Sequence, residues 1–299
     1  MKSLRVSAAV AGAVLWMIAS VEAGAAVRTG YAIALTRGSR LLVQARVNGH
    51  PVEALLDSAA EMTLVDAQFA RALKLSAGAT VSGQGSGESS FDADLVKGVS
   101  LEVFGVKMQD QTVAVVDLAD VGTRLLGRRL DVILGREIFD AARLKIDIDA
   151  RHVTVLPRDG RPAGTRLELT SEHGVETIPV QLEDAGTLRA TFDLGNGSEV
   201  LVGSKLAERL HLLTDGRTVS MQRGGGLGGE TERRTFVLRS LVVAGKRFQD
   251  VPAAIDAQPS ASDLNVGISV LRHFLITTDF AAHAVWLEPR TDAREAATR

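Results

Sequence analysis

The chain has 299 residues, 45% of them hydrophobic, and a formal net charge of -2 at pH 7. This length allows about two domains of ordinary size. The balanced charge gives no basic surface of the kind that nucleic-acid-binding proteins carry, so nucleic acid is not an expected partner. The sequence has no cysteine, which excludes disulfide bonds as a source of stability.

The first residues are typical of an export signal. Lys2 and Arg5 give a positively charged start, residues 6–18 are apolar, and residues 23–25 read Ala-Gly-Ala, a small-residue cleavage pattern. The apolar run is shorter than the roughly 20 residues that cross a bilayer, which favours cleavage over an uncleaved anchor. We therefore predict a signal peptide over residues 1–25 and a periplasmic or secreted mature protein.

The remainder reads mostly as short strands. Apolar runs are separated by glycine, aspartate and asparagine every eight to twelve residues, which favours all-β lobes over βαβ units. A few segments instead have the apolar spacing of short helices. The predicted strands in the first half are residues 40–47, 52–56, 99–104, 112–116 and 153–156, and the predicted helices are residues 65–75, 136–143 and 203–212.

An internal repeat relates the two halves. Residues 54–60 and 190–196 are each an apolar run that ends in an aspartate, Asp57 or Asp193, inside a turn-like sequence. Helical segments, hairpins turned at Gly105 and Gly245, and closing strand pairs follow in the same order in both halves. The sequence separation between matching segments varies slightly, as expected from changes in loop length in a duplicated domain, whereas a solenoid would repeat many times with a short period. We predict two homologous lobes over residues 27–157 and 165–290, a polar linker over 158–164 and a disordered tail over 291–299.

Two kinds of glycine recur in both halves. One kind forms glycine-rich hairpin tips, although the second tip alone could also be a disordered loop. The other ends an apolar-apolar-Gly element just before a short helix. The tip glycines are Gly83, Gly85, Gly87, Gly225, Gly226, Gly228 and Gly229, and the apolar-apolar-Gly elements end at Gly135 and Gly267.

With these motifs in matched order over residues 30–290, each half resembles a retropepsin-type aspartic protease lobe, and the pair resembles a two-lobed pepsin-type chain. The resemblance implies two β-barrel lobes, flaps at the glycine-rich tips, and an endopeptidase that acts on peptides or proteins without a metal or cofactor. It implies that Asp57 and Asp193 form the catalytic dyad. Two carboxylates held close together cannot both ionise cheaply, so one would keep a proton while the other activates a water. Because one chain carries both aspartates, we expect a monomer rather than a homodimer.

Both turns depart from the usual Asp-Thr/Ser-Gly pattern of the family. The first keeps the hydroxyl at Ser58 but has Ala59 in the place of glycine, whereas the second keeps Gly195 but has Leu194 in the place of the hydroxyl. The reciprocal hydroxyl contact between lobes could then form from one side only, and the extra methyl of Ala59 could displace a carboxylate. A catalytically silent exported peptide-binding module on the same fold therefore remains open beside the enzyme.

Other polar residues receive structural interpretations. We expect Asp147 and Asp279 to act as turn or hydrogen-bonding residues in closing hairpins. The six histidines show no metal-ligand spacing. We interpret Arg233 and Arg234, which lie beside two glutamates, as a solvated strand edge.

Overall fold

The computed structural model describes residues 30–76, 78–172, 174–258 and 261–290. The predicted signal peptide and the predicted C-terminal tail lie outside these residues. Within the described ranges, no helix has both the length and the apolar character that a membrane crossing requires.

The first lobe is an eight-stranded sheet that closes on itself. Its strand order is β2-β3-β4-β9-β5-β8-β7-β6, and a further pairing of β3 with β7 closes the sheet into a barrel. Its elements are β2 (Ala34–Leu35), β3 (Leu41–Val47), β4 (His50–Leu56), β5 (Leu64–Asp66), α1 (Ala67–Ala72), β6 (Thr80–Gln84), β7 (Ser90–Val103), β8 (Val106–Val116), α2 (Ala119–Val121), the π-helical turn Gly122–Leu126, β9 (Val132–Leu134) and α3 (Glu137–Ala141).

The second lobe repeats this arrangement. Its order is β13-β14-β15-β20-β16-β19-β18-β17, closed by a pairing of β14 with β18. Its elements are β13 (Thr170–Glu172), β14 (Val175–Leu182), the 3-10 turn Glu183–Ala185, β15 (Thr187–Phe192), β16 (Val200–Gly203), α4 (Ser204–Arg209), β17 (Ser220–Gly226), β18 (Gly229–Val243), β19 (Lys246–Asp256), β20 (Leu264–Val266) and α5 (Ile268–Leu271). The predicted all-β fold of two homologous lobes is confirmed.

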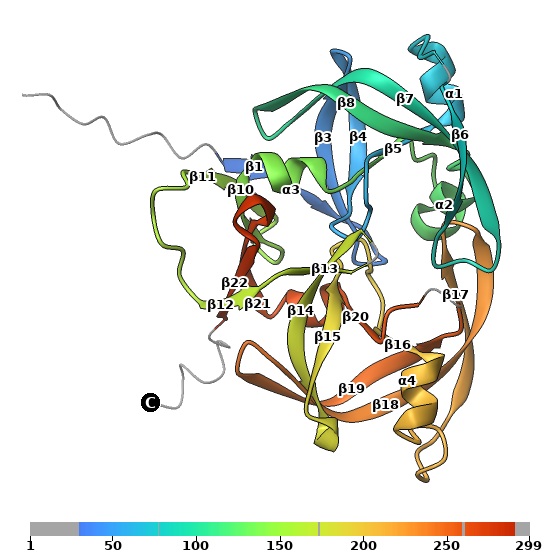
Figure 1. Ribbon diagram of the computed structural model, residues 1–299, viewed down its shortest axis with the longest axis vertical. Coiled ribbons are helices and arrows are strands. Elements are labelled where there is room, and N and C mark those ends of the chain that lie inside the picture. Colours follow the sequence, from blue (N-terminus) through green and yellow to red (C-terminus); the bar gives the residue numbers. More distant parts are fainter. Residues whose placement is uncertain (1–29, 77, 173, 259–260, 291–299) are drawn as a thin grey trace, which may run out of the picture.

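A third sheet joins the lobes. Its order is β1-β11-β10-β21-β22-β12. The first three strands belong to the first half of the chain and the last three to the second half. The two halves meet where β10 pairs with β21, with Leu144 opposite Thr278. Figure 1 shows this sheet on the left and the two lobes above and below. Its strands are β1 (Gly30–Ala32), β10 (Arg143–Asp147), β11 (His152–Leu156), β12 (Thr165–Glu168), β21 (Phe274–Asp279) and β22 (Ala284–Pro289), with the 3-10 turn Phe280–Ala282 between the last two.

The predicted helices are shorter in the structure. The first begins only at Ala67, because residues 64–66 are held as β5 between β8 and β9. Asp66 then caps α1 by accepting hydrogen bonds from the backbone of Gln68 and Phe69. The other two helices, α3 and α4, likewise occupy only the middle of their predicted ranges, and residues 157–164 carry no helix or strand.

Candidate functional site

Asp57 and Asp193 occupy the same place in each lobe. Asp57 follows β4, which pairs in parallel with β9, and its backbone N–H donates to the carbonyl of Leu134 at 3.0 Å. Asp193 follows β15, which pairs with β20 in the same way, and its N–H donates to Val266 at 3.1 Å. The parallel pairing therefore ends both strands in a fixed turn and positions both carboxyl groups.

Ser58 links the two turns across the lobe junction. Its hydroxyl donates to the carbonyl of Phe192 at 2.7 Å and accepts from the N–H of Leu194 at 2.9 Å. In the second turn Leu194 takes the corresponding place, and its side chain is fully buried in the core. The hydroxyl contact is thus made from one side only, as expected, and apolar packing replaces its counterpart.

Gly195 brings the second turn into direct contact with Asp57. A Cβ atom on Gly195 would lie 2.3 Å from the Cγ of Asp57, closer than two such atoms can approach. Only glycine therefore allows the Asp57 carboxyl to lie against the turn that carries Asp193. The N–H of Gly195 in turn donates to Asp193 Oδ1 at 2.8 Å, so one residue contacts both carboxyl groups.

The two carboxyl groups differ in their hydrogen bonds. Asp57 Oδ1 accepts from the N–H of Ala59 at 2.8 Å. Asp193 Oδ1 accepts from the N–H of Asn196 as well as that of Gly195, and its Oδ2 accepts from the side-chain amide of Asn265 at 2.6 Å. Asp193 therefore has more donors that favour its ionised form.

Sequence reasoning missed Asn265. It lies in β20 one position before Val266, and its side-chain oxygen also accepts from the side chain of Asn196 at 2.9 Å. The first lobe has Ile133 at the equivalent place in β9. The sequence signal for Asn265 was a polar residue at a position where the matching apolar-apolar-Gly element of the first half has an apolar one.

Burial dominates the acidity of the pair. It raises the pKa of Asp57 to about 8, the charge of Asp193 adds to this, and the backbone donors Ala59 and Ala60 and the charge of Arg40 oppose it. Burial also raises the pKa of Asp193, against the hydrogen bonds from Asn265, Asn196 and Gly195 and the charge of Arg40. The pair titrates as a unit. The additional donors favour the ionised form of Asp193 over the ionised form of Asp57.

The glycine-rich segments form two hairpins that meet at their tips. One is β6/β7 and the other β17/β18, and Figure 1 shows them side by side on the right. The N–H of Gly87 donates to Leu227 O and that of Ser89 donates to Gly228 O, both at 2.9 Å. The second tip is therefore an ordered hairpin, not a disordered loop.

Most of the predicted tip glycines are required by close contacts. A Cβ on Gly85 would lie 2.4 Å from Leu227 O, one on Gly87 2.3 Å from Gly228 C, and one on Gly228 2.1 Å from Ser89 O. A Cβ on any of Gly83, Gly225 and Gly226 would also clash with a neighbour, whereas Gly229 faces open space at a φ of +100°.

Gly135 and Gly267 pack against the segments that follow the Asp57 and Asp193 turns. A Cβ on Gly135 would lie 2.4 Å from Met62 C, and one on Gly267 would lie 2.3 Å from Asn196 O. Each glycine thus lets the start of the following helix pack directly against the chain that leaves the aspartate turn. The two copies of this element play the same structural role.

Asp147 and Asp279 end strands β10 and β21 of the shared sheet and contact residues in that sheet or in the segments next to it. Asp147 accepts from the N–H of Ala150 at 2.7 Å and pairs with Arg290. Asp279 is fully buried and pairs with Arg143 at 3.0 Å and Arg158 at 3.2 Å. These contacts agree with the predicted structural roles.

The interpretation of Arg233 as part of a solvated edge is wrong. Its side chain is only 5% exposed, and its Nη2 donates to Ser86 O of the opposite hairpin at 2.9 Å. Arg234, the next residue of β18, is exposed as expected. Alternation along the strand points one arginine outward and the other toward the first lobe.

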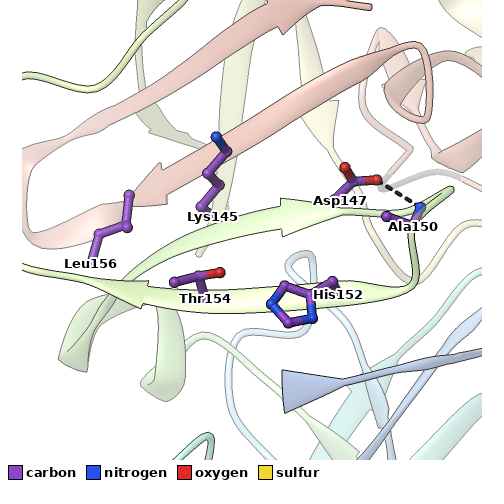
Figure 2. A pocket seen from close by; sticks show the side chains of 6 residues that line it. All are labelled: Lys145, Asp147, Ala150, His152, Thr154 and Leu156. Atoms are coloured by element: carbon purple, nitrogen blue, oxygen red, sulfur yellow. Dashed lines mark hydrogen bonds between the residues drawn. The ribbon is translucent and has the colours of Figure 1, made fainter. Parts of the chain in front are cut away.

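A pocket also lies on the sheet that joins the lobes. Figure 2 shows this pocket on the β10/β11 hairpin, where it is lined by Lys145, Asp147, Ala150, His152, Thr154 and Leu156, none of which belongs to either aspartate turn. Among the described residues, no group of histidine, aspartate and glutamate side chains is arranged to hold a metal ion.

Comparison with known proteins agrees with this geometry. A family model described as aspartyl protease matches the chain twice, over residues 43–138 and over residues 178–270. Each match contains one aspartate turn and one apolar-apolar-Gly element. No curated protein matches the chain significantly.

Proposed function

Because the chain belongs to the aspartyl protease family, we propose that it is an aspartic endopeptidase in which Asp57 and Asp193 act as one dyad on a peptide bond. The observation that carries the proposal is the contact of the Asp57 carboxyl with Gly195, whose N–H is hydrogen-bonded to Asp193. Ser58 supports it by fixing the two turns against each other. The departures from the usual turn sequence are thus compatible with a closed pair.

The unequal hydrogen bonds suggest the role of each carboxyl. Ionised Asp193 would take a proton from a bound water, whose oxygen attacks the carbonyl carbon of the scissile bond. Protonated Asp57 would donate a hydrogen bond to the carbonyl oxygen as negative charge develops there. When the C–N bond breaks, a proton passes from the dyad to the leaving amine, and the pair again holds one proton.

The two hairpins would hold the substrate over the dyad. Their tips are joined by backbone hydrogen bonds, which an entering peptide would have to displace. An extended peptide could then pair with the exposed backbone of the tips, so that main-chain hydrogen bonds supply affinity and side-chain pockets supply selectivity. The glycines would let the tips open and close.

We further propose that the enzyme acts as a monomer after export. Both aspartates come from one chain, and the shared six-stranded sheet fixes the lobes against each other without a second copy. Export rests on the signal-like sequence of residues 1–25. Sedimentation of the purified protein and N-terminal sequencing of the exported product test these two points.

The proposal is tested by peptide-library cleavage between pH 3 and pH 8, with the Asp57→Asn/Asp193→Asn double variant as control. We expect the wild-type chain to cut internal peptide bonds and the folded double variant to cut none. Peptide binding without cleavage by the wild-type chain at any pH would overturn the proposal in favour of a silent binding module. Measuring the melting temperature of both proteins confirms that each is folded.

A further inference from the structure

The guanidinium groups of Arg40 and Arg233 have no role in the proposed mechanism. Arg40 lies just before β3, where its Nη1 donates to the carbonyl of Gly38 at 3.2 Å. That carbonyl abuts Gly197 of the second lobe, since a Cβ on Gly197 would lie 1.9 Å from it. Arg40 is therefore at the lobe junction, next to the turn of Asp193. Its Nε is buried and has no hydrogen-bond partner.

Arg233 approaches from the second lobe. Its Nη2 donates to Ser86 O of the opposite hairpin, while its Nε is also buried without a hydrogen-bond partner. The stem packs on the backbone of its own hairpin, as a Cβ on Gly224 would lie 3.0 Å from the Arg233 Cδ. Arg233 is thus beneath the joined tips, with part of its guanidinium group unused.

A third arginine is already neutralised. Arg124 donates to Gly226 O at 2.7 Å and forms an ion pair with Asp120 at 2.7 Å. By contrast, neither Arg40 nor Arg233 forms an ion pair with a carboxylate of the described residues. Arg233 is buried and Arg40 is half-buried with a buried Nε. Charges in such positions are normally paired, so two unpaired guanidinium groups are a costly feature.

These charges share one poorly solvated region with the dyad. Burial is the main cause that lowers the pKa of Arg40; the charges of Asp193 and Asp57 oppose this, and those of Arg124 and Arg233 add to it. With one proton on the proposed dyad, a single negative charge lies near Arg40, and Arg233 adds a second positive charge near Arg40. An additional anion would balance the region.

We propose that Arg40 and Arg233 form an anion-binding subsite beside the dyad that selects peptides with an acidic side chain close to the scissile bond. The inference rests on the proposed function and names its substrate class. Guanidinium groups suit a carboxylate because their N–H groups form a planar fork that matches its two oxygens. Each arginine has an unused Nε–H for this purpose, and the water-poor surroundings strengthen the contact.

The test uses acetylated and amidated octapeptides in which each position in turn holds Glu, Gln or Lys. Their binding to the Asp57→Asn/Asp193→Asn variant is measured by fluorescence anisotropy, and their cleavage by the wild-type chain is measured in parallel. We expect Glu at one or two positions to improve affinity about tenfold or more over Gln, and Lys to abolish binding. Equal affinity for Glu and Gln at every position would overturn the subsite.

Variants then assign the preference to the two arginines. In the same inactive background, Arg40→Gln and Arg233→Gln should each remove most of the preference for Glu over Gln. Arg234→Gln, on the exposed side of the same strand, should leave it unchanged. A preference that survives both substitutions would contradict the proposal. Since the Glu and Gln comparison is first made with both arginines intact, it holds even where a variant fails to fold.

The outcomes separate the subsite from the activity. Preferential binding of Glu peptides without any cleavage would overturn the proposed function and leave the subsite supported. Cleavage with no preference for acidic peptides would overturn the subsite and leave the proposed function supported.

Discussion

At the scale of single residues, the two carboxyl groups of the proposed dyad have unequal hydrogen bonds. The repeat singled out Asp57 and Asp193, and the resemblance to aspartic protease lobes predicted the one-sided contact of Ser58. Neither could predict Asn265 or the buried position of Arg233, because the importance of each depends on a partner that only folding brings near. Asn265 contacts Asp193 across 72 positions of sequence, and Arg233 contacts Ser86 across 147.

The first prediction concerns the pH dependence of cleavage. In the proposed mechanism the active dyad carries one proton, so activity should be lost when Asp57 deprotonates at high pH and when Asp193 protonates at low pH. Because the pKa of Asp57 is raised to about 8, we expect kcat/KM to persist at neutral pH and to fall about tenfold per pH unit well above pH 8. A full pH–rate profile measures this, and a decline already complete at pH 6 would contradict the assignment.

The second prediction concerns Asn265. Its amide donates to Asp193 Oδ2, which favours the ionised form and lowers the pKa of Asp193. Asn265→Ala should therefore move the acidic limb of the pH–rate profile to higher pH, with a loss in kcat/KM of about tenfold at acidic pH and a smaller loss at neutral pH.

Asn48→Gly is the matched control for Asn265→Ala. Asn48 is exposed and lies at a φ of +47° in the turn between β3 and β4, at the opposite end of β4 from Asp57, so its removal should leave the profile unchanged. A uniform loss across all pH values in Asn265→Ala would indicate a purely structural role for this residue.

At the scale of elements, the sequence predicted where the hairpins turn but not how long their strands are. The turns at Gly105 and Gly245 fall where the sequence predicts them, with positive φ values of +71° and +82°. Strand β7 begins at Ser90, well before the predicted start at residue 99, because polar residues near the tip pair with β6. Alternating polarity is a weak signal where both strand faces approach solvent.

The third prediction concerns the contact between the hairpin tips. Gly228→Ala places a methyl group 2.1 Å from Ser89 O at a φ of +95°, so the tips must separate. Amide hydrogen exchange at Gly87 and Ser89, the two donors of the tip contact, should accelerate at least about tenfold as protection by those bonds is lost.

Gly229→Ala provides a matched control for the tip contact. It has a similar φ of +100°, yet its Cβ would meet nothing within 4 Å. It imposes the same backbone penalty without a clash, so exchange at Gly87 and Ser89 should stay slow. Equal acceleration in both variants would show that backbone strain, and not the tip contact, controls exchange.

At the scale of the whole molecule, the shared sheet makes the lobes interdependent. The repeat predicted two lobes and a linker, but it could not predict that β10 and β21 pair across the molecule, since the same strands could have closed each lobe separately. The buried ion pair of Arg143 with Asp279 lies at this junction. Loss of one partner would leave a charge buried between the lobes.

The fourth prediction measures that interdependence. Arg143→Met should lower the free energy of unfolding by about 3–5 kcal/mol, because Asp279 is fully buried and retains only Arg158 as an ionic partner. Arg272→Met, which removes a pair with Asp149 in which both side chains are well exposed, should cost less than about 1 kcal/mol. Urea unfolding of both variants gives the comparison, and equal costs would contradict the structural importance assigned to the junction.

The measurement that tests the central claim most directly compares kcat/KM for the wild-type chain, Asp57→Asn, Asp193→Asn and the double variant on one cleaved peptide. Residues that act as a unit are strongly non-additive. We therefore expect each single variant to lose nearly as much activity as the double variant. A single variant that keeps substantial activity, or losses that simply add, would show that the two aspartates do not form one dyad.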